Sequence, residues 1–382
     1  MPKYKFTEIA INSTEKKKPT EADKATYIGL EHLDSGTLTV SRWGSEVAPI
    51  GEKLIMKKGD VLFGKRRAYQ KKVGIAPFDG IFSAHGMVLR PREEVITKEY
   101  FPLFISSDYF LNEAIRISVG SLSPTVNWKD LKDLTFNIPT IEEQRRITPI
   151  VWAAINAKNA YRNLIQQTDD LVKSQFIERF DSVRDCHKQM KIVDACVDLD
   201  DIKCGPFGTQ LKQAEYVKSG VAIWGIPQIN SGFAIPPTDY VTPQKAEALR
   251  AFSLVSGDIA MSRKGNVGQC AVFPSHFEDG IIASDVLRIR VNRSVFDPVF
   301  LMLQLHLSEA VRTQILRVSD GSVMAGVNVT KLKNIIVYAP ELAQQKDFVA
   351  FVQQSDKSKF ELEQAVQRID NLIKSLIQQD DN

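Results

Sequence analysis

Two stretches of the chain place their apolar residues at alternating steps of four and three, which is the spacing of a coiled-coil seam. The seam positions are Ile147, Val151, Ala154, Lys158, Tyr161, Ile165, Thr168 and Val172 in the first stretch, and Phe348, Val352, Ser355, Lys359, Leu362, Val366, Ile369, Ile373 and Leu376 in the second. Each pattern predicts a helix of roughly 38 residues, about 57 Å long, which exceeds the size of one small domain. An amphipathic helix packed on its own domain is the alternative, and the length favours a coiled coil.

The first of these long helices has a defined start and one irregular position. Thr140 and Glu143 have the spacing of a capping box, with Thr140 at the N-cap. Pro149 lies inside the apolar pattern. Because a proline removes one helical hydrogen bond, we expect Pro149 to kink the helix or to delay its regular part.

A different pattern fills the segments that precede the long helices. Short apolar runs typical of strands occur at 53–56, 61–63, 80–83 and 87–89 in the first segment, and at 272–273, 281–282 and 286–289 in the second. Each set is followed by a stretch with helical spacing, at about 97–117 and about 298–316. Strands and helices that do not alternate strictly predict α+β domains.

The chain also repeats itself. Val126-Asn127, Pro139 and Gln144 recur at an offset of 201 positions as Val327-Asn328, Pro340 and Gln345. Upstream the offset shrinks, and the matching pairs are Gly59-Asp60 with Gly257-Asp258 (198), Ile28-Gly29-Leu30 with Trp224-Gly225-Ile226 (196), and Lys5-Phe6-Thr7-Glu8 with Lys191-Ile192-Val193-Asp194 (186). The second copy therefore carries insertions, the largest near 205–208. A shared scaffold with divergent surfaces indicates two modules that recognise different things.

The repeat and the helices together predict the architecture. We expect an α+β protein with globular domains at 1–138 and 183–339 and long helices at 139–182 and 340–382. Two repeats, each a globular domain followed by a helix, close most simply when the helices pair antiparallel about a pseudo-two-fold axis, with the domains at opposite ends. A parallel coil between two chains would leave the internal repeat unexplained.

Charge is distributed unevenly along the chain. The net charge is +3, but residues 53–72 contain eight Lys or Arg and one acid, Asp60, which gives +7 locally. A basic stripe on a near-neutral protein is typical of a phosphate-binding surface. A solvated surface loop is the alternative explanation for such a run.

Composition narrows the class further. The chain has 43% hydrophobic and 25% charged residues, which is ordinary for a soluble globular protein. It has no stretch with the roughly 18–20 apolar residues of a membrane span and no apolar secretory signal. Cys186-His187 with Cys196 and Cys204 fits no common zinc pattern. We expect a protein of the reducing cytoplasm that uses no membrane, metal or cofactor.

The order, duplication and spacing of these motifs resemble the specificity subunits of type I restriction–modification systems. The residues that carry the resemblance are the two exit segments 126–144 and 327–345, the Gly59-Asp60 and Gly257-Asp258 turns, and Gly205-Pro206-Phe207-Gly208-Thr209. The first domain lacks a clear counterpart of the last segment.

The resemblance covers essentially the whole chain. It implies two target recognition domains, each reading one half of a bipartite site in double-stranded DNA, with the helices setting the gap. It also implies recruitment of two methyltransferase subunits, which bind S-adenosylmethionine, and, for restriction, of motor–nuclease subunits.

Two loops that follow strands carry most of the candidate DNA contacts. Arg and Lys can pair with guanine, Gln with adenine, and all of them with phosphate. Gly and Ser in the turns before the exit segments allow close approach of the backbone to phosphate, although a tight turn without a ligand explains them equally well. The candidates are Lys65, Arg66, Arg67, Gln70, Lys71, Lys72 and Ser121 in the first domain, and Gln210, Lys212, Arg263, Lys264, Asn266 and Ser322 in the second.

Enzyme motifs are absent or incomplete. The run from Gly59 to Arg66 nearly matches the phosphate-binding loop motif, but Arg66 occupies the position of the magnesium-binding Ser or Thr. The five histidines are scattered, with no pair at ligand spacing. We therefore expect a DNA-recognition subunit that is not catalytic by itself. Two other classes stay open: a coiled-coil scaffold whose domains bind proteins rather than DNA, and a methylase or nuclease with an unrecognised site.

Overall fold

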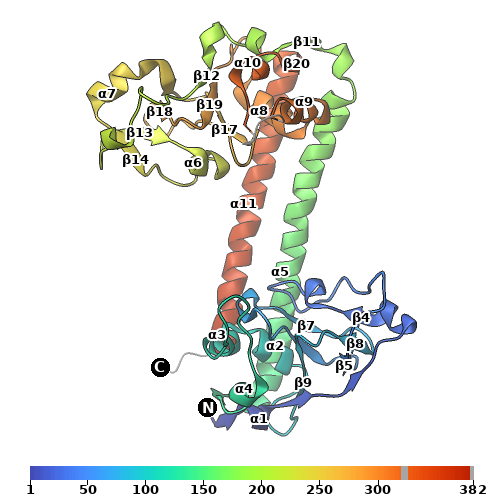
Figure 1. Ribbon diagram of the computed structural model, residues 1–382. Helices are drawn as coiled ribbons and strands as arrows, with labels where there is room; N and C mark the ends of the chain where they lie inside the picture. Colours follow the sequence, from blue (N-terminus) through green and yellow to red (C-terminus); the bar gives the residue numbers. More distant parts are fainter. Residues whose placement is uncertain (320–325, 379–382) are drawn as a thin grey trace. The chain divides into compact units, whose positions relative to one another are not determined.

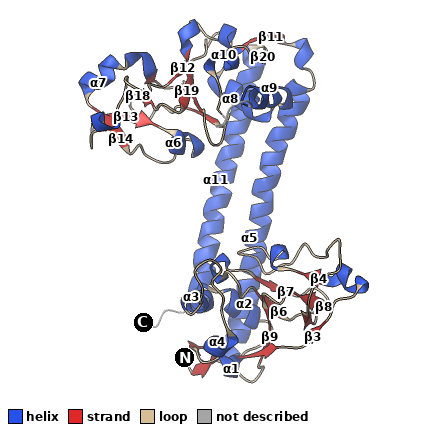
Figure 2. Ribbon diagram, in the orientation of Figure 1, coloured by secondary structure: helices blue, strands red, loops and turns tan. Residues whose placement is uncertain are grey.

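The computed structural model describes residues 1–319 and 326–378, and the chain divides into two compact units. The first unit comprises 1–163 and 362–382, and the second comprises 164–361. Both long helices contribute to both units, because α5 (Ile141–Phe176) and α11 (Leu342–Gln378) each begin in one unit and end in the other. Many of the elements are labelled in Figure 1, and Figure 2 colours helices and strands by type.

The first unit contains two four-stranded sheets and one two-stranded ribbon. The first sheet has the order β2 (Ala10–Ser13), β9 (Met87–Pro91), β6 (Val61–Phe63) and β7 (Val73–Ile75). The second sheet has the order β3 (Lys16–Lys17), β5 (Lys53–Met56), β8 (Gly80–Phe82) and β4 (Tyr27–Ile28). In the ribbon, β1 (Lys3–Lys5) pairs with β10 (Thr135–Asn137).

The second unit repeats this plan. Its first sheet has the order β12 (Ile202–Cys204), β19 (Val286–Ile289), β16 (Ile259–Ser262) and β17 (Cys270–Val272). Its second sheet has the order β14 (Asp239–Val241), β13 (Val221–Trp224), β18 (Gly280–Ile282) and β15 (Ser253–Leu254). In its ribbon, β11 (Lys188–Lys191) pairs with β20 (Ile336–Ala339).

The two units differ at the edges of their second sheets. Both share three strands, in which β4 or β13 runs parallel to the next strand, β8 or β18. The first unit adds β3 beside β5, whereas the second adds β14 beside β13, at the opposite edge. The mixed sheets and helices confirm the α+β class, and the shared strand order confirms the internal repeat.

Alternating side chains of the central strands face two separate cores. Val61 and Phe63 of β6 pack in the larger core of the first unit, and Leu62 between them packs in the core between the two sheets. In the second unit Ile259 and Met261 of β16 face one core, and Ala260 faces the other. Successive residues of a strand point to opposite faces, so both faces of the first sheet are buried in each unit.

Helices cover one face of each first sheet. The remaining helices are α1 (Phe6–Ile9), α2 (Phe101–Ser106), α3 (Asp108–Arg116) and α4 (Trp128–Leu131) in the first unit, and α6 (Ile226–Asn230), α7 (Pro243–Ala248), α8 (Pro298–Leu307), α9 (Glu309–Ser319) and α10 (Val329–Leu332) in the second.

The prediction of one continuous helix at 97–117 is wrong. The helix breaks at Ser107, whose hydroxyl accepts the Phe110 N–H. Ser308 interrupts the second stretch in the same way, between α8 and α9.

The ribbon confirms the most distant match in the repeat. Phe6 N–H donates to Leu134 O at 2.8 Å, and Ile192 N–H donates to Ile335 O at 2.8 Å. The donors differ by 186 positions and the acceptors by 201, as the sequence match requires. Each unit therefore begins and ends on the same two-stranded ribbon.

The long helices run antiparallel in each unit. In the first unit Lys158 Nζ lies 2.6 Å from Asp370 Oδ1. In the second, Lys359 Nζ lies 2.7 Å from Asp169 Oδ1, and Arg179 pairs with Asp347 at 2.6 Å. Adding 201 to Lys158 and Asp169 gives Lys359 and Asp370. The two seam lysines thus make equivalent ion pairs, as expected from an antiparallel pair with pseudo-two-fold symmetry.

The proposed seam residues are all sheltered from solvent. Val151, Val172 and Val352 are buried. Tyr161, Ile165, Leu362, Val366, Ile369 and Ile373 are half-buried. Outside the seam, Leu164, Leu171 and Leu372 are exposed. The distinction follows the 3.5-residue spacing rather than hydrophobicity alone.

Pro149 does not delay the first helix. The helix starts at Ile141 and continues through Pro149 without interruption. Thr140 Oγ1 accepts the Glu143 N–H at 3.3 Å, which agrees with the predicted N-cap. The proline is tolerated eight residues into the helix because it lacks only one donor, and the chain on both sides keeps its helical bonds.

Candidate nucleic-acid interface

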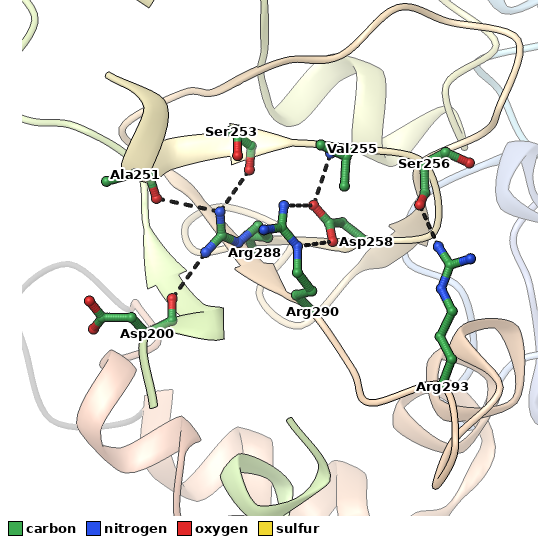
Figure 3. A network of polar contacts seen from close by, with 9 residues as sticks. All are labelled: Asp200, Ala251, Ser253, Val255, Ser256, Asp258, Arg288, Arg290 and Arg293. Atoms are coloured by element: carbon green, nitrogen blue, oxygen red, sulfur yellow. Dashed lines mark hydrogen bonds and ion pairs between the residues drawn. The ribbon is translucent and has the colours of Figure 1, made fainter. Parts of the chain in front are cut away.

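The repeated Gly-Asp turn fixes the central hairpin of each unit. Asp60 is buried, accepts two hydrogen bonds from Arg90 at 2.8 and 2.9 Å, and also accepts the Lys57 N–H. In the second unit Asp258 accepts from Arg290 at 2.8 and 2.7 Å and from the Val255 N–H, as Figure 3 shows. A bidentate guanidinium–carboxylate pair fixes both partners in orientation. The motif therefore positions the hairpin and does not itself face a ligand.

Arg288 adds a clamp that only the second unit has. Its guanidinium donates to the carbonyl oxygens of Ser253 at 2.8 Å, Asp200 at 3.0 Å and Ala251 at 3.4 Å (Figure 3). Burial lowers the pKa of Arg288. The equivalent position in the first unit is Val88, which packs in the core between the sheets. Arg288 thus joins the two sheets through polar bonds where the first unit uses apolar packing.

The loop between β6 and β7 holds most of the first unit's candidates. It runs from Gly64 to Lys72, and the Gly64 N–H donates to Lys72 O. A short 3₁₀ turn at Ala68–Gln70 is flanked by Arg67 and Lys71, whose φ angles are 54° and 50°. Non-glycine residues rarely adopt this left-handed conformation, and such strain tends to occur at functional sites.

The structure brings this loop against the turn before the exit segment. Arg67 N–H donates to Pro124 O at 2.6 Å, and Val126 N–H donates to Lys65 O at 2.9 Å. The Arg67 side chain also reaches Ser123 Oγ at 3.4 Å. The turn carries the exposed residues Ser121 and Leu122. Two candidate segments that lie far apart in sequence therefore form one surface.

The loop's cations divide into free and engaged groups. Arg66 and Arg67 are exposed, and neither has a carboxylate partner among the ion pairs of the described residues. Lys71 pairs with Asp108 at 2.7 Å, and Lys72 donates to Leu30 O at 2.7 Å. Gln70 is half-buried. The two arginines are thus the side chains best placed to reach a ligand.

The potential around the arginines is positive. Burial, followed by the charges of Arg66, Lys65 and Lys53, lowers the pKa of His85. Burial and the charge of Lys16 lower the pKa of Lys65. Arg66 Nη1 lies 3.4 Å from His85 Nε2. A neutral His85 next to this cluster adds no further charge and leaves the positive field available to an anion.

The second unit has the equivalent loop with different contacts. It joins β16 to β17, and the Ser262 N–H donates to Gln269 O at 2.7 Å. Arg263 Nη1 donates to Cys204 Sγ and Nε to Val327 O, so this arginine holds the loop against β12. Lys264 pairs with Asp285 at 2.9 Å but remains exposed. Asn266 is exposed at the tip.

The remaining candidates of the second unit lie near the inserted segment or outside the described residues. Gln210 and Lys212 are exposed in the insertion that follows β12. Gly205 opens this insertion, and a Cβ there would meet Ala283 O at 2.0 Å, so only glycine fits. Ser322 falls outside the residues that the structure describes.

The exit-segment glutamines have a structural role that the sequence motif did not reveal. Gln144 is fully buried, accepts the Thr97 N–H at 2.7 Å, and donates to Val95 O and Pro139 O. Gln345 makes the same three bonds, with Asp297 N–H, Val295 O and Pro340 O. Each glutamine ties the start of a long helix to its globular unit.

One Cys–His pair was missed in the sequence. Cys270 N–H donates to His306 Nε2 at 3.1 Å, and Cys270 Sγ lies 3.3 Å from the same nitrogen. Cys270 is buried, and burial raises the pKa of its thiol. A buried thiol with a raised pKa is a poor nucleophile. Among the described residues no group of His, Cys, Asp and Glu could hold a metal ion, and no helix is long and apolar enough to cross a membrane.

Comparison with known proteins identifies the family. The type I restriction modification DNA specificity domain matches residues 5–167 and 198–372, which is most of the chain. The specificity subunit of the type I restriction enzyme EcoDI from Escherichia coli is 23% identical over 182 residues, or 46% of this chain. The match spans only 40% of that relative's length.

Solved structures share the fold. One, described as the structural basis of complex assembly and conformational transition of the type I R-M system, covers 99% of this chain and 96% of its own at a TM-score of 0.60 and 19% identity. The S subunit of a type I restriction–modification system from M. genitalium covers 98% and 95% at a TM-score of 0.55 and 14% identity. With both of its repeats matched, the chain belongs to the family of type I restriction–modification DNA specificity proteins.

Proposed function

We propose that this chain is the DNA specificity subunit of a type I restriction–modification complex. Each globular unit reads one half of a bipartite site in double-stranded DNA, and the paired helices α5 and α11 set the gap between the halves. Residues 1–138 and 183–339 act as the target recognition domains, and residues 139–182 and 340–382 as the spacer helices. The chain is not catalytic by itself.

One observation carries the proposal. The two units hold a hairpin loop at the same place in the same sheet, between β6 and β7 and between β16 and β17, yet the chemistry of the loops differs. The first presents Arg66 and Arg67, and the second presents Lys264 and Asn266. A common frame with unlike exposed donors suits two readers of unlike sequences.

The partners follow from the family and are part of the proposal. Two methyltransferase subunits that bind S-adenosylmethionine supply the methyl transfer, and motor–nuclease subunits supply restriction. The long helices offer docking surface, because Leu164, Leu171, Phe360 and Leu372 are exposed along them. The complex works on DNA in the cytoplasm.

The test is the methylated motif of the host genome. Deleting the gene should remove methylation at one split motif, and restoring the gene should restore it. Loss of a continuous motif, or no loss, would contradict bipartite reading. Purified chain should methylate nothing without its partner subunits. Activity of the chain alone would favour a methylase, and an absence of salt-sensitive DNA binding by the assembled complex would favour a protein scaffold.

A further inference from the structure

A cleft in the second unit lies beside the loop between β16 and β17 and is lined by cations that form no ion pair among the described residues. The cleft has a volume of about 400 Å³. Its polar lining comes from three sources: Lys173 on α5, His306 and Arg312 on the α8–α9 pair, and Asn266 and Gln269 on the loop between β16 and β17. No carboxylate of the described residues lines it. All of these residues belong to the second unit.

The two permanent cations form no ion pair within the described part of the chain. Lys173 and Arg312 are exposed, and no ion pair joins either of them to an acid among residues 1–319 and 326–378. After burial, the charge of Arg312 is the second cause that lowers the pKa of His306. His306 Nε2 already accepts the Cys270 N–H, so the neutral ring carries its proton on Nδ1. The charged side chains that line the cleft are therefore all positive among the residues that the structure describes.

The equivalent cleft of the first unit provides the contrast. It has a volume of about 200 Å³ and is lined by Lys71, Lys158 and Lys374. Asp108 pairs with Lys71 at 2.7 Å and with Lys374 at 3.4 Å, and Asp370 pairs with Lys158 at 2.6 Å. Each lysine of this cleft thus pairs with a lining acid, and Asp108 is shared by two of them.

The repeat relates the two clefts residue by residue. Lys374 corresponds to Lys173, and buried Leu111 corresponds to exposed Arg312, both at the offset of 201. The second unit thus keeps the helix lysine and adds an arginine, while Glu309, at the position of Asp108, does not line the cleft. In the first unit the lysines pair with acids of the same cleft, whereas in the second unit the cations are available to bind an anion.

We propose that the cleft of Lys173, Arg312, Asn266 and Gln269 binds a phosphate group. Arginine and lysine supply charge-assisted donors, and the two amides supply neutral donors that suit the remaining oxygens. Gly268, with a φ of 84°, also lines the cleft and lets the backbone approach closely. The site rests on the proposed function: next to Asn266 the natural source is the phosphodiester backbone of the DNA, and Lys173 then makes a spacer helix a direct DNA contact.

The test compares the full chain with the double variant Lys173→Gln, Arg312→Gln in the assembled complex. Binding to a duplex that contains the methylated motif is measured over a range of salt concentrations. We expect weaker binding and a slope of log affinity against log salt that is shallower by about one unit, because one phosphate contact is lost and each contributes roughly 0.9. Lys374→Gln is the matched control and should leave the slope unchanged. Arg312→Lys in place of Arg312→Gln should restore most of the slope.

A second measurement distinguishes the source of the phosphate. Thermal unfolding of the wild-type chain in inorganic phosphate is compared with unfolding in chloride of equal ionic strength. Stabilisation that the double variant loses, together with unchanged DNA binding, assigns the cleft to a free phosphate instead. A double variant that equals the wild type in both measurements overturns the inference. The proposed function fails separately, if the wild-type complex does not bind its own duplex.

Discussion

Single residues decide which charges of the basic stripe can reach DNA. The structure divides the stripe between the two ends of β6, with Lys57 and Lys58 before the strand and the Gly64–Lys72 loop after it. In the loop, Arg66 and Arg67 are exposed, whereas Lys71 and Lys72 are held by Asp108 and Leu30. Charge counted along the sequence therefore overstates the number of available contacts.

This division yields a residue-scale prediction. Arg66→Ala with Arg67→Ala should weaken DNA binding by the assembled complex, because two exposed guanidinium groups are lost. If both contact phosphate, the salt slope should become shallower by up to about two units. The matched control, Lys57→Ala with Lys58→Ala, removes the same charge from the other end of β6. An equal effect of both variants would show that general charge, rather than the loop, is responsible.

A second prediction at the residue scale concerns His306 and the dependence of stability on pH. Burial lowers its pKa in the folded state, while the unfolded chain protonates near the ordinary value of about 6.5. The unfolded state then binds more protons below that value, so stability is lost as pH falls through it. The unfolding temperature of the full chain should drop between pH 7.5 and 5.5. The unfolding temperature of the His306→Gln variant, whose side chain can still accept the Cys270 N–H, should drop less over the same pH range. An equal drop would mean that other groups cause the acid sensitivity.

At the scale of elements, the ion pairs between the long helices specify how the helices align. Lys158 and Asp370 are only 14% and 27% exposed, and the lysine lies in a seam of mostly apolar residues. A polar residue at a seam position fixes register at some cost in stability. Asp370→Lys should destabilise the first unit by about 1–2 kcal/mol, between the values of surface and buried pairs.

A charge swap tests this register pair. Lys158→Asp with Asp370→Lys should recover most of the lost stability, because attraction returns with reversed sign. Urea unfolding of the wild type, the single variant and the swap measures the coupling. Asp370→Asn serves as a control that removes the charge without adding repulsion. A swap as unstable as the single variant would show that the pair does not set the alignment.

Elements differ in how well the sequence predicted them. The helices and the repeat were predicted because their signals are periodic and duplicated, and the structure confirms an α+β repeat with antiparallel helices. The break at Ser107 was missed because the apolar spacing runs on through it, while a local cap bond ends the helix. The sequence showed that Gln144 recurs in the repeat, but it did not show the hydrogen bonds of this side chain, since its partners Thr97 and Val95 lie far away in sequence.

The candidate site was predicted in part. The basic loop and the 118–123 turn were each chosen from composition, and the structure brings them together through Arg67, Pro124 and Val126. The local sequence does not predict that these two segments contact each other. Nor does it show that Asp108 pairs with Lys71 or that Arg312 forms no ion pair among the described residues, because both facts depend on which distant side chains meet.

At the scale of the whole molecule, modular reading follows from the ribbon that opens and closes each unit. β1 pairs with β10, and β11 pairs with β20, so both ends of each globular unit meet where a long helix begins. Within this frame the units can diverge, as their second sheets do, without disturbing the helices. The proposed role of the helices, to set the gap between the two half-sites, is then independent of what each unit recognises.

A paired insertion tests whether the helices are that device. Seven residues are inserted between Asn163 and Leu164 and seven more between Gln364 and Ala365, positions related by the offset of 201. Each insertion restores the heptad and adds about 10.5 Å, near three base pairs of duplex at about 3.4 Å each. We expect both half-sites to be kept and the gap to lengthen by about two to three base pairs. The control inserts four residues into α5 alone, which creates a stutter against the unchanged α11 and should impair assembly or activity. Sequencing of methylated DNA exposed to each complex gives the motif, and an active paired variant with an unchanged gap would show that something other than the helices sets the distance.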